Sequence, residues 1–415
     1  MNLTAKRLLF YTRTKLGLVT RISWACACTF AERHLPKYLV MTPDFTEFPD
    51  ISKETWLQQI RKDLKDKSME DLSWELSETL AVEPFMHADD FPQPPLPLST
   101  QAHPWEICED IQVTDPVAAN RLALDALEGG AQALCFHLSA GPDMAALTQL
   151  LEGIHPDFIG LHFAGEGAVS NPGALLALLA QLAGARGLKT ASLHGSVAYN
   201  PALYAEMVDW RYLADLLQFV SENFPRFSLV SLRPEASSGP VSDIVSLLRQ
   251  GNLYLEKLSE RGVSPARLAA HLQFDMPIGK SYFYEIAKLR AFKLLWLHIL
   301  KVWEAPLYLP ATAVHFNNEV YTDDLYSNMI RATTMAMSAV IGGADRLTVL
   351  PYDAGRETTA QYPQAFGRRI ARNVQHLLQL ESGLGDIADP AAGSYYVEQL
   401  TRQLAAAAWN DFVKS

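Results

Sequence analysis

The feature that most constrains the fold is an alternation of short apolar runs and helix-period segments, repeated eight times between about residues 106 and 381. The apolar runs predict strands at 106–112, 132–138, 158–163, 189–195, 227–232, 268–275, 307–314 and 346–352. Segments with helical periodicity lie between them, at 117–129, 173–185, 211–223, 281–303, 324–341 and 364–381. Consecutive strands joined by helices pair in parallel with right-handed crossovers, and eight such units close into a barrel.

We therefore predict an α/β fold, a (β/α)8 barrel formed by residues 102–415. An open, doubly wound sheet would show the same alternation. That fold usually carries a glycine-rich first turn, and no Gly-x-Gly-x-x-Gly follows the first predicted strand. The barrel is the favoured interpretation.

An N-terminal arm is predicted ahead of the barrel, over residues 41–101. It begins with a helix over about 50–80, for which Ser52 is a plausible N-cap. Four prolines within residues 91–98 exclude a helix and a central strand, so this stretch is expected to be an extended connector.

Residues 1–40 differ in composition, with seven Lys or Arg residues and one acidic residue. Such a segment is typical of an organelle transit peptide. The abrupt start of acidic sequence at Met41-Thr-Pro-Asp favours a second interpretation, in which Met41 is the true start. We expect a cytoplasmic protein, or a mitochondrial one only if residues 1–40 are a transit peptide.

Charge and cysteine usage restrict the partners. The formal net charge of -11 argues against nucleic acid and anionic membrane, which both require a basic face. Four cysteines, two of them in Cys26-Ala-Cys28, do not make a disulfide framework and indicate a reducing compartment. No apolar run approaches the ~20 residues that a membrane span needs.

Polar residues at the predicted strand ends are the candidate ligand-facing groups, because barrel chemistry lies at the C-terminal ends of strands. These residues are His137, His162, His194, Arg233, Asp275, His315 and Asp353. Of these, His137, His162 and His194, with Asp353 opposite, suggest a zinc site. The first strand lacks the His-x-His of the metal-dependent barrel hydrolases, however, so no metal site is predicted. Ser196 lacks the turn of a nucleophile elbow.

The helix predicted at 281–303 is apolar almost all round. Such a helix must be covered on more than its barrel face. We expect the cover to come from a partner chain or from the N-terminal arm.

The last third of the chain resembles the methylmalonyl-CoA mutase family. The segments that carry the resemblance are Tyr284-Glu-Ile-Ala-Lys-Leu-Arg-Ala291, Tyr326-Ser-Asn-Met-Ile-Arg331, Arg369-Ile-Ala-Arg-Asn373, Glu381-Ser-Gly383 and Asp389-Pro-Ala-Ala-Gly-Ser-Tyr-Tyr396-Val-Glu398. The last is the most distinctive, and its candidate structural residues are Asp389, Pro390, Gly393, Ser394, Tyr395 and Tyr396. Likeness is weaker from residue 50 onward, including His103-Pro-Trp-Glu-Ile107.

The resemblance implies a (β/α)8 barrel that binds acyl-CoA through its centre, next to a separate domain that binds adenosylcobalamin. Homolysis of the cobalt–carbon bond starts the isomerisation of methylmalonyl-CoA to succinyl-CoA in this family. The cofactor supplies the radical chemistry, and the protein orients the substrate and excludes water.

Departures from the family pattern fall on its functional residues. The Asp-x-His-x-x-Gly of the cobalamin domain is absent from the sequence. The carbonyl-polarising histidine after the fifth strand falls near Arg233, and the Arg-Leu-Ser contact to CoA becomes His271-Leu-Gln273. The glutamate that contacts the adenosyl group is replaced by Ala354, and Gln273 joins the candidate ligand-facing residues. Together these changes remove the differential binding of a transition state.

The leading hypothesis is therefore a non-catalytic small subunit of a mutase. It would pair with a homologous large catalytic subunit that binds adenosylcobalamin and acyl-CoA. The alternative is an active acyl-CoA mutase barrel completed by a separate cobalamin-binding chain. A metal-dependent barrel hydrolase is the third hypothesis.

Overall fold

The computed structural model describes residues 49, 51–65, 67–77, 80–102, 104–204, 208–235, 239–355 and 363–414. The chain forms two compact units, residues 1–60 and residues 61–415. The predictions for residues 1–40 and for a start at Met41 lie outside the described residues. Within the described part, no helix has the length and apolarity that a bilayer crossing requires.

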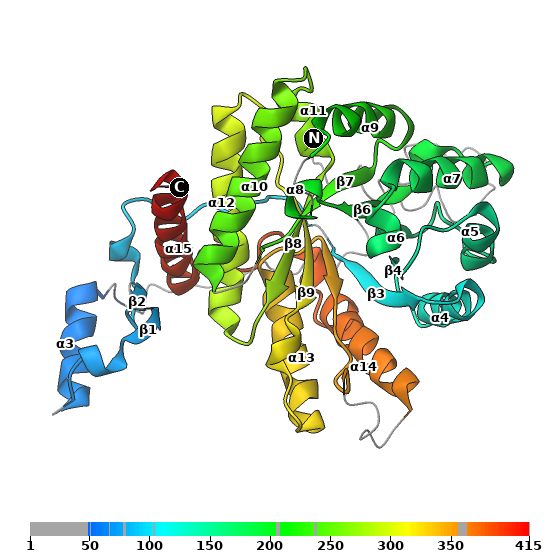
Figure 1. The fold of residues 1–415 in the computed structure, drawn as a ribbon. Coiled ribbons are helices and arrows are strands. Elements are labelled where there is room, and N and C mark those ends of the chain that lie inside the picture. Colours follow the sequence, from blue (N-terminus) through cyan, green and yellow to red (C-terminus); the bar gives the residue numbers. More distant parts are fainter. Residues whose placement is uncertain are drawn as a thin grey trace, which may run out of the picture. The chain divides into compact units, whose positions relative to one another are not determined.

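Eight parallel strands of the described chain close into a barrel (Figure 1). They are β3 (Glu106–Val113), β4 (Ala133–Leu138), β5 (Gly160–Ala164), β6 (His194–Tyr199), β7 (Phe227–Leu232), β8 (Leu272–Ile278), β9 (Ala311–Phe316) and β10 (Arg346–Thr348). Each strand pairs with its sequence neighbour, and β10 pairs with β3 to close the ring. The predicted (β/α)8 barrel is confirmed.

Helices lie on the outside of the barrel (Figure 1). They are α4 (Pro116–Glu128), α5 (Met144–Leu150), α6 (Glu166–Val169), α7 (Pro172–Ala185), α8 (Pro201–Tyr204), α9 (Trp210–Asn223), α10 (Pro240–Ser259), α11 (Pro265–Ala270), α12 (Tyr282–Val302), α13 (Leu325–Ile341), α14 (Gln364–His376) and α15 (Tyr395–Lys414). Asp115, Asn171 and Asp209 cap α4, α7 and α9 by accepting backbone hydrogen bonds. The main hydrophobic core lies between these helices and the outward faces of the strands.

Three strands begin at least four residues later than predicted. Residues 190–192 form a 3-10 turn, so β6 begins at His194, one residue before the predicted strand ended. Residues 265–270 form α11, because Ser264 caps a helix there, and β8 begins at Leu272. Strand β9 begins at Ala311 rather than 307. These shifts move side chains along the barrel axis, which matters for the site.

The helix predicted over 50–80 is shorter in the structure. The helix α3 spans Lys53–Leu64, and Ser52 Oγ accepts a hydrogen bond from Thr55 N at its start. Lys65 ends it with a positive φ of 55°. Residues beyond it form an antiparallel hairpin of β1 (Trp74–Ser77) and β2 (Leu80–Val82), so the prediction was wrong there.

Within the described chain, helix α12 is covered by three other helices, while the expected cover by a partner chain stays a prediction. Helix α15 packs along α12, and α10 and α13 pack beside it (Figure 1). Residues such as Trp296 and Phe292 are fully buried. The all-round apolar sequence follows from this position between the barrel and an outer helix.

Candidate functional site

The barrel lumen is lined by polar and small side chains, because alternate residues of each strand point inward. In β3 the inward residues are Glu106, Cys108, Asp110 and Gln112, while Ile107 and Ile111 are buried against the helices. The lining therefore departs from the branched apolar residues that usually fill a barrel.

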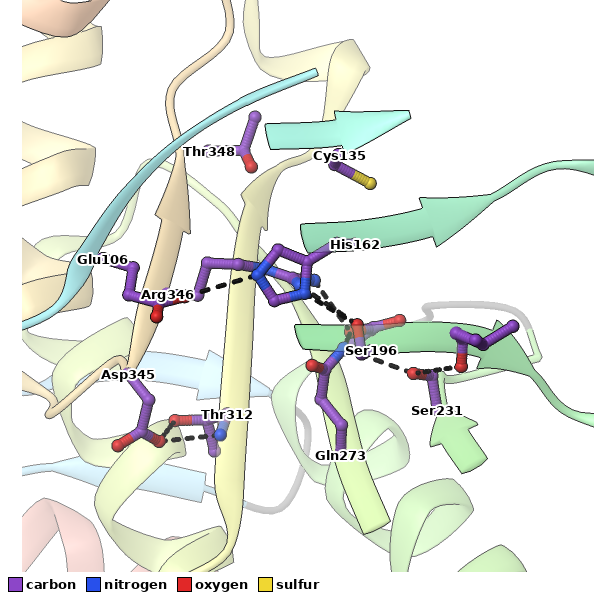
Figure 2. Close-up of polar contacts among 12 residues, drawn as sticks. Glu106, Cys135, His162, Ser196, Ser231, Gln273, Thr312, Asp345, Arg346 and Thr348 are labelled. Atoms are coloured by element: carbon purple, nitrogen blue, oxygen red, sulfur yellow. Dashed lines mark hydrogen bonds and ion pairs between the residues drawn. The ribbon is translucent and has the colours of Figure 1, made fainter. Parts of the chain in front are cut away.

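One end of the lumen is closed around Glu106, the first residue of β3. One carboxylate oxygen lies 3.3 Å from His162 Nε2, and the other lies 3.0 Å from His194 Nε2. His162 Nδ1 lies 2.8 Å from Ser196 Oγ on the next strand (Figure 2). His162 and Ser196 are almost fully buried.

Arg346 extends this cluster across the barrel. Its guanidinium donates to Ser196 Oγ at 3.2 Å (Figure 2). It also lies 3.9 Å from Asp275 Oδ1. Gln273 donates to Asp275 at 2.7 Å and to Ser231 at 3.2 Å. We call this set the lumen network: Glu106, His162, His194, Ser196, Ser231, Gln273, Asp275 and Arg346. It joins residues of six of the eight strands and crosses the barrel axis.

The protonation states of the lumen network are mutually consistent. Burial and the charge of Arg346 lower the pKa of His162 to about 4, so its imidazole is neutral near pH 7. Burial alone would raise the pKa of Glu106, but hydrogen bonds from His162 and His194 hold it far below its usual range. A neutral His162 donates from Nε2 to Glu106 and accepts at Nδ1 from Ser196, while Ser196 accepts from Arg346.

The C-terminal end of the lumen is hollow. A cavity of about 880 Å³ extends from the lumen network toward α14, and we call it the lumen cavity. Its wall includes Asp110, Cys135, His137, His315 and Arg233. His137 Nε2 lies 3.3 Å from Asp110 Oδ2, and this hydrogen bond raises the pKa of His137. A cavity of this size accommodates a small ligand.

The predicted site residues separate into two groups. His137 and His315 are the penultimate residues of β4 and β9, Arg233 directly follows β7, and Asp353 follows β10, all along the lumen cavity.

The other predicted residues lie deeper in the barrel. His194 is the first residue of β6, so the prediction that it ends a strand was wrong; the turn at residues 190–192 displaced the strand. His162 is in the middle of β5, and Gln273 is the second residue of β8, both within the lumen network rather than at the barrel mouth. The three histidines therefore do not converge on a metal, which removes the geometric basis of the hydrolase hypothesis.

Several lumen residues were not predicted from the sequence. Asp110 and Cys135 lie inside strands, and Glu106 and Arg346 each begin one. A partial signal was present, because every second residue from Glu106 to Gln112 is polar or a cysteine, although Glu109 interrupts the alternation. Polar residues at every second position of a strand whose other face is covered by helices indicate a polar lumen.

The most distinctive sequence motif forms a buried clamp far from the lumen. The guanidinium of Arg290 on α12 contacts the carboxylate of Asp389 and donates to Glu398 at 2.7 Å. The same Glu398 accepts from Gly393 N at 3.2 Å. Asp389 also accepts from Leu98 N at 2.7 Å, so the clamp fastens the proline-rich connector. The fold and site thus define a (β/α)8-barrel protein whose lumen is closed at one end and hollow at the other.

Comparison with known proteins identifies the family. A model of the methylmalonyl-CoA mutase family matches residues 140–414. The methylmalonyl-CoA mutase small subunit of Porphyromonas gingivalis is 32% identical over 400 residues, covering 89% of this chain and 63% of that protein. The small subunit of Streptomyces virginiae is 30% identical, covering 88% and 64%. The methylmalonyl-CoA mutase of Cereibacter sphaeroides is 29% identical, covering 86% and 57%. The chain belongs to the methylmalonyl-CoA mutase family.

The chain spans less than two thirds of the length of these three relatives. Among solved structures, Yersinia pestis dihydropteroate synthase aligns with 73% of this chain and 98% of its own at 12% identity. Its TM-score of 0.35 is too low to support any inference.

Proposed function

We propose that this chain is a non-catalytic small subunit of an adenosylcobalamin-dependent methylmalonyl-CoA mutase. It pairs with a homologous large subunit, and that partner binds the cobalamin and the acyl-CoA and carries out the isomerisation. The complex acts in the cytoplasm. The observation that carries the proposal is the lumen network, which crosses the barrel axis along which family barrels bind acyl-CoA.

The closure of the axis is the physical argument. A ligand that runs through the barrel would have to displace Arg346, His162 and Glu106 and break their hydrogen bonds. Each of these buried groups would then need a new partner, at a cost of about 1–3 kcal/mol per unsatisfied group. A long acyl-CoA chain offers few groups that match a carboxylate and a guanidinium in the same positions.

The position of Arg233 adds to this argument. It directly follows β7, and by resemblance the family's histidine that polarises the substrate carbonyl falls near it. A guanidinium cannot act as a proton donor and acceptor near neutral pH, because it stays charged. This barrel therefore lacks the group on which the family's chemistry depends at that position.

A second candidate function is favoured by the lumen cavity. Its volume of about 880 Å³ leaves room for an acyl group that enters from the C-terminal end. In this alternative the chain is an active mutase barrel completed by a separate cobalamin-binding chain.

Purification of the chain together with its native partner distinguishes the two candidate functions. We expect a one-to-one complex with a larger homologue that contains Asp-x-His-x-x-Gly, and no tight binding of adenosylcobalamin or methylmalonyl-CoA by the isolated chain. Arg233→Ala in this chain should leave kcat and KM of the complex unchanged. The matched control is alanine at the histidine of the large subunit that corresponds to Arg233, which should abolish activity.

Tight binding of cobalamin or acyl-CoA by the isolated chain would contradict the proposal. So would a loss of kcat in the Arg233→Ala complex, because a supporting barrel has no role in the chemical step. Recovery of only a small cobalamin-binding chain would establish the alternative.

A further inference from the structure

Three potential metal ligands meet in the wall of the lumen cavity. Asp110 on β3 and Cys135 on β4 are register partners, and His137 lies two residues beyond Cys135 on the same face. Asp110 Oδ2 and His137 Nε2 are 3.3 Å apart, and Cys135 Sγ and His137 Nε2 are 3.7 Å apart. The three ligand atoms all lie within 4.8 Å of one another.

The two separations at His137 are close to the edges of a zinc coordination tetrahedron. Zinc binds oxygen and nitrogen at about 2.0–2.2 Å and sulfur at about 2.3 Å. At tetrahedral angles, these bond lengths place neighbouring ligand atoms about 3.3–3.6 Å apart. A thiolate, an imidazole and a carboxylate together select a borderline-soft cation such as zinc over magnesium or calcium.

The charges around the three ligands fit a divalent cation. Arg346 carries a positive charge nearby, but Asp110, Asp275 and a Cys135 thiolate carry three negative charges. A divalent ion would bring this group of four side chains to neutrality. Burial raises the pKa of the Cys135 thiol, so the thiol is protonated without a cation, and metal binding would release its proton to solvent.

The fourth coordination position would face the lumen cavity. Asp110 and His137 line that cavity, and 42% and 31% of their side chains are exposed. Cys135 lines it too and is buried. Three protein ligands and one position open to water or a small ligand are typical of zinc sites that are not purely structural.

We propose that Asp110, Cys135 and His137 form a zinc site at the hollow end of the barrel, with one coordination position open to the lumen cavity. The site goes beyond the proposed function and does not depend on a partner chain. It is distinct from the three-histidine site considered from the sequence, because His162 and His194 belong to the lumen network.

Cobalt(II) substitution tests the proposal on the full chain. Cys26 and Cys28 are first replaced by serine, so that Cys108 and Cys135 are the two thiols left in the chain. Metal-free protein of this background should take up one equivalent of Co²⁺ and develop a near-ultraviolet thiolate-to-cobalt charge-transfer band, which one equivalent of Zn²⁺ abolishes. Cys135→Ser should remove the band, and His137→Ala should weaken zinc binding at least about tenfold.

Cys108→Ser is the matched control, because Cys108 is a buried cysteine on the neighbouring strand but not one of the three ligands. It should keep the band. Circular dichroism of each variant establishes that it is folded. The proposal is overturned if the background protein shows no charge-transfer band, or if Cys135→Ser retains it. Either result leaves the small-subunit proposal untouched, since that is tested by partner and cobalamin binding.

Discussion

The two ends of the barrel lumen are lined by the same kinds of residue. One end is crossed by the lumen network, and the other is hollow. Around Glu106 and Arg346, polar side chains that cross the axis find partners on other strands. Around Asp110 and His137, the groups pair locally and leave a cavity of about 880 Å³. The position of a residue along the strand therefore decides whether a polar lumen is closed or hollow.

The closed end should depend most on Arg346. Arg346→Ala removes the cation next to Asp275 and the donor to Ser196, and each of the two largely buried groups left without it costs about 1–3 kcal/mol. Denaturant unfolding should show a decrease of about 4 kcal/mol in the free energy of unfolding. His315→Ala at the hollow end should cost about 1 kcal/mol or less. Equal decreases in the free energy of unfolding for Arg346→Ala and His315→Ala would contradict the distinction between the two ends.

Tight strand packing at the closed end should make Gly195 irreplaceable. Its φ is 155°, and a Cβ there would lie 1.6 Å from the carbonyl oxygen of Leu161 on β5. Gly195→Ala should cost about 3 kcal/mol, because strain and overlap act together. Gly184→Ala on α7, where a Cβ meets nothing within 4 Å, is the control and should be neutral or stabilising. Thermal unfolding compares the two.

The closed end should lose stability as the pH falls. The folded-state pKa of His162 is about 4, below its unfolded value of about 6.5, so between these values only the unfolded chain binds the proton. The free energy of unfolding should fall by about 2 kcal/mol between pH 6.5 and pH 5. His162→Gln should remove this part of the slope. A slope unchanged in that variant would show that another group titrates.

The hollow end should give the opposite and smallest response. In metal-free protein, the hydrogen bond to Asp110 raises the pKa of His137, so its stabilisation is present below about pH 6.5 and lost as the pH rises through the folded pKa. Because both side chains are partly exposed, the effect should be below about 1 kcal/mol. NMR titration of the His137 ring in the wild type and in Asp110→Asn checks the direction; an unshifted pKa in the variant would contradict it.

The barrel itself follows from the sequence because strand–helix alternation is a local signal. The arrangement of side chains in the lumen does not follow from the sequence. Which residues point inward, and how far along the barrel axis they lie, depends on where each strand begins. A three-residue turn at 190–192 moved His194 from one end of the barrel to the other. Arg346 begins the last strand and meets Ser196, 150 residues earlier, and no local pattern encodes that contact.

For the clamp around Arg290, the sequence showed the motif but not its contacts. Its motif stood out in the sequence, yet its partners became clear only in the structure, where Asp389 and Glu398 surround a buried guanidinium. The helix α15 that carries Glu398 was not predicted, although its residues cover α12. The sequence analysis expected that cover from a partner chain or from the N-terminal arm.

The same clamp has a consequence for the order of folding. Asp389 binds the backbone of Leu98, 291 residues earlier in the chain, and β10 closes the ring against β3. Contacts of such long sequence separation form slowly, because closing the loop costs conformational entropy before the contact contributes any favourable energy. During synthesis, Arg290 emerges from the ribosome well before either of its acidic partners. We therefore expect the clamp to remain open, with Arg290 solvated and unpaired, until residues near 400 have been added.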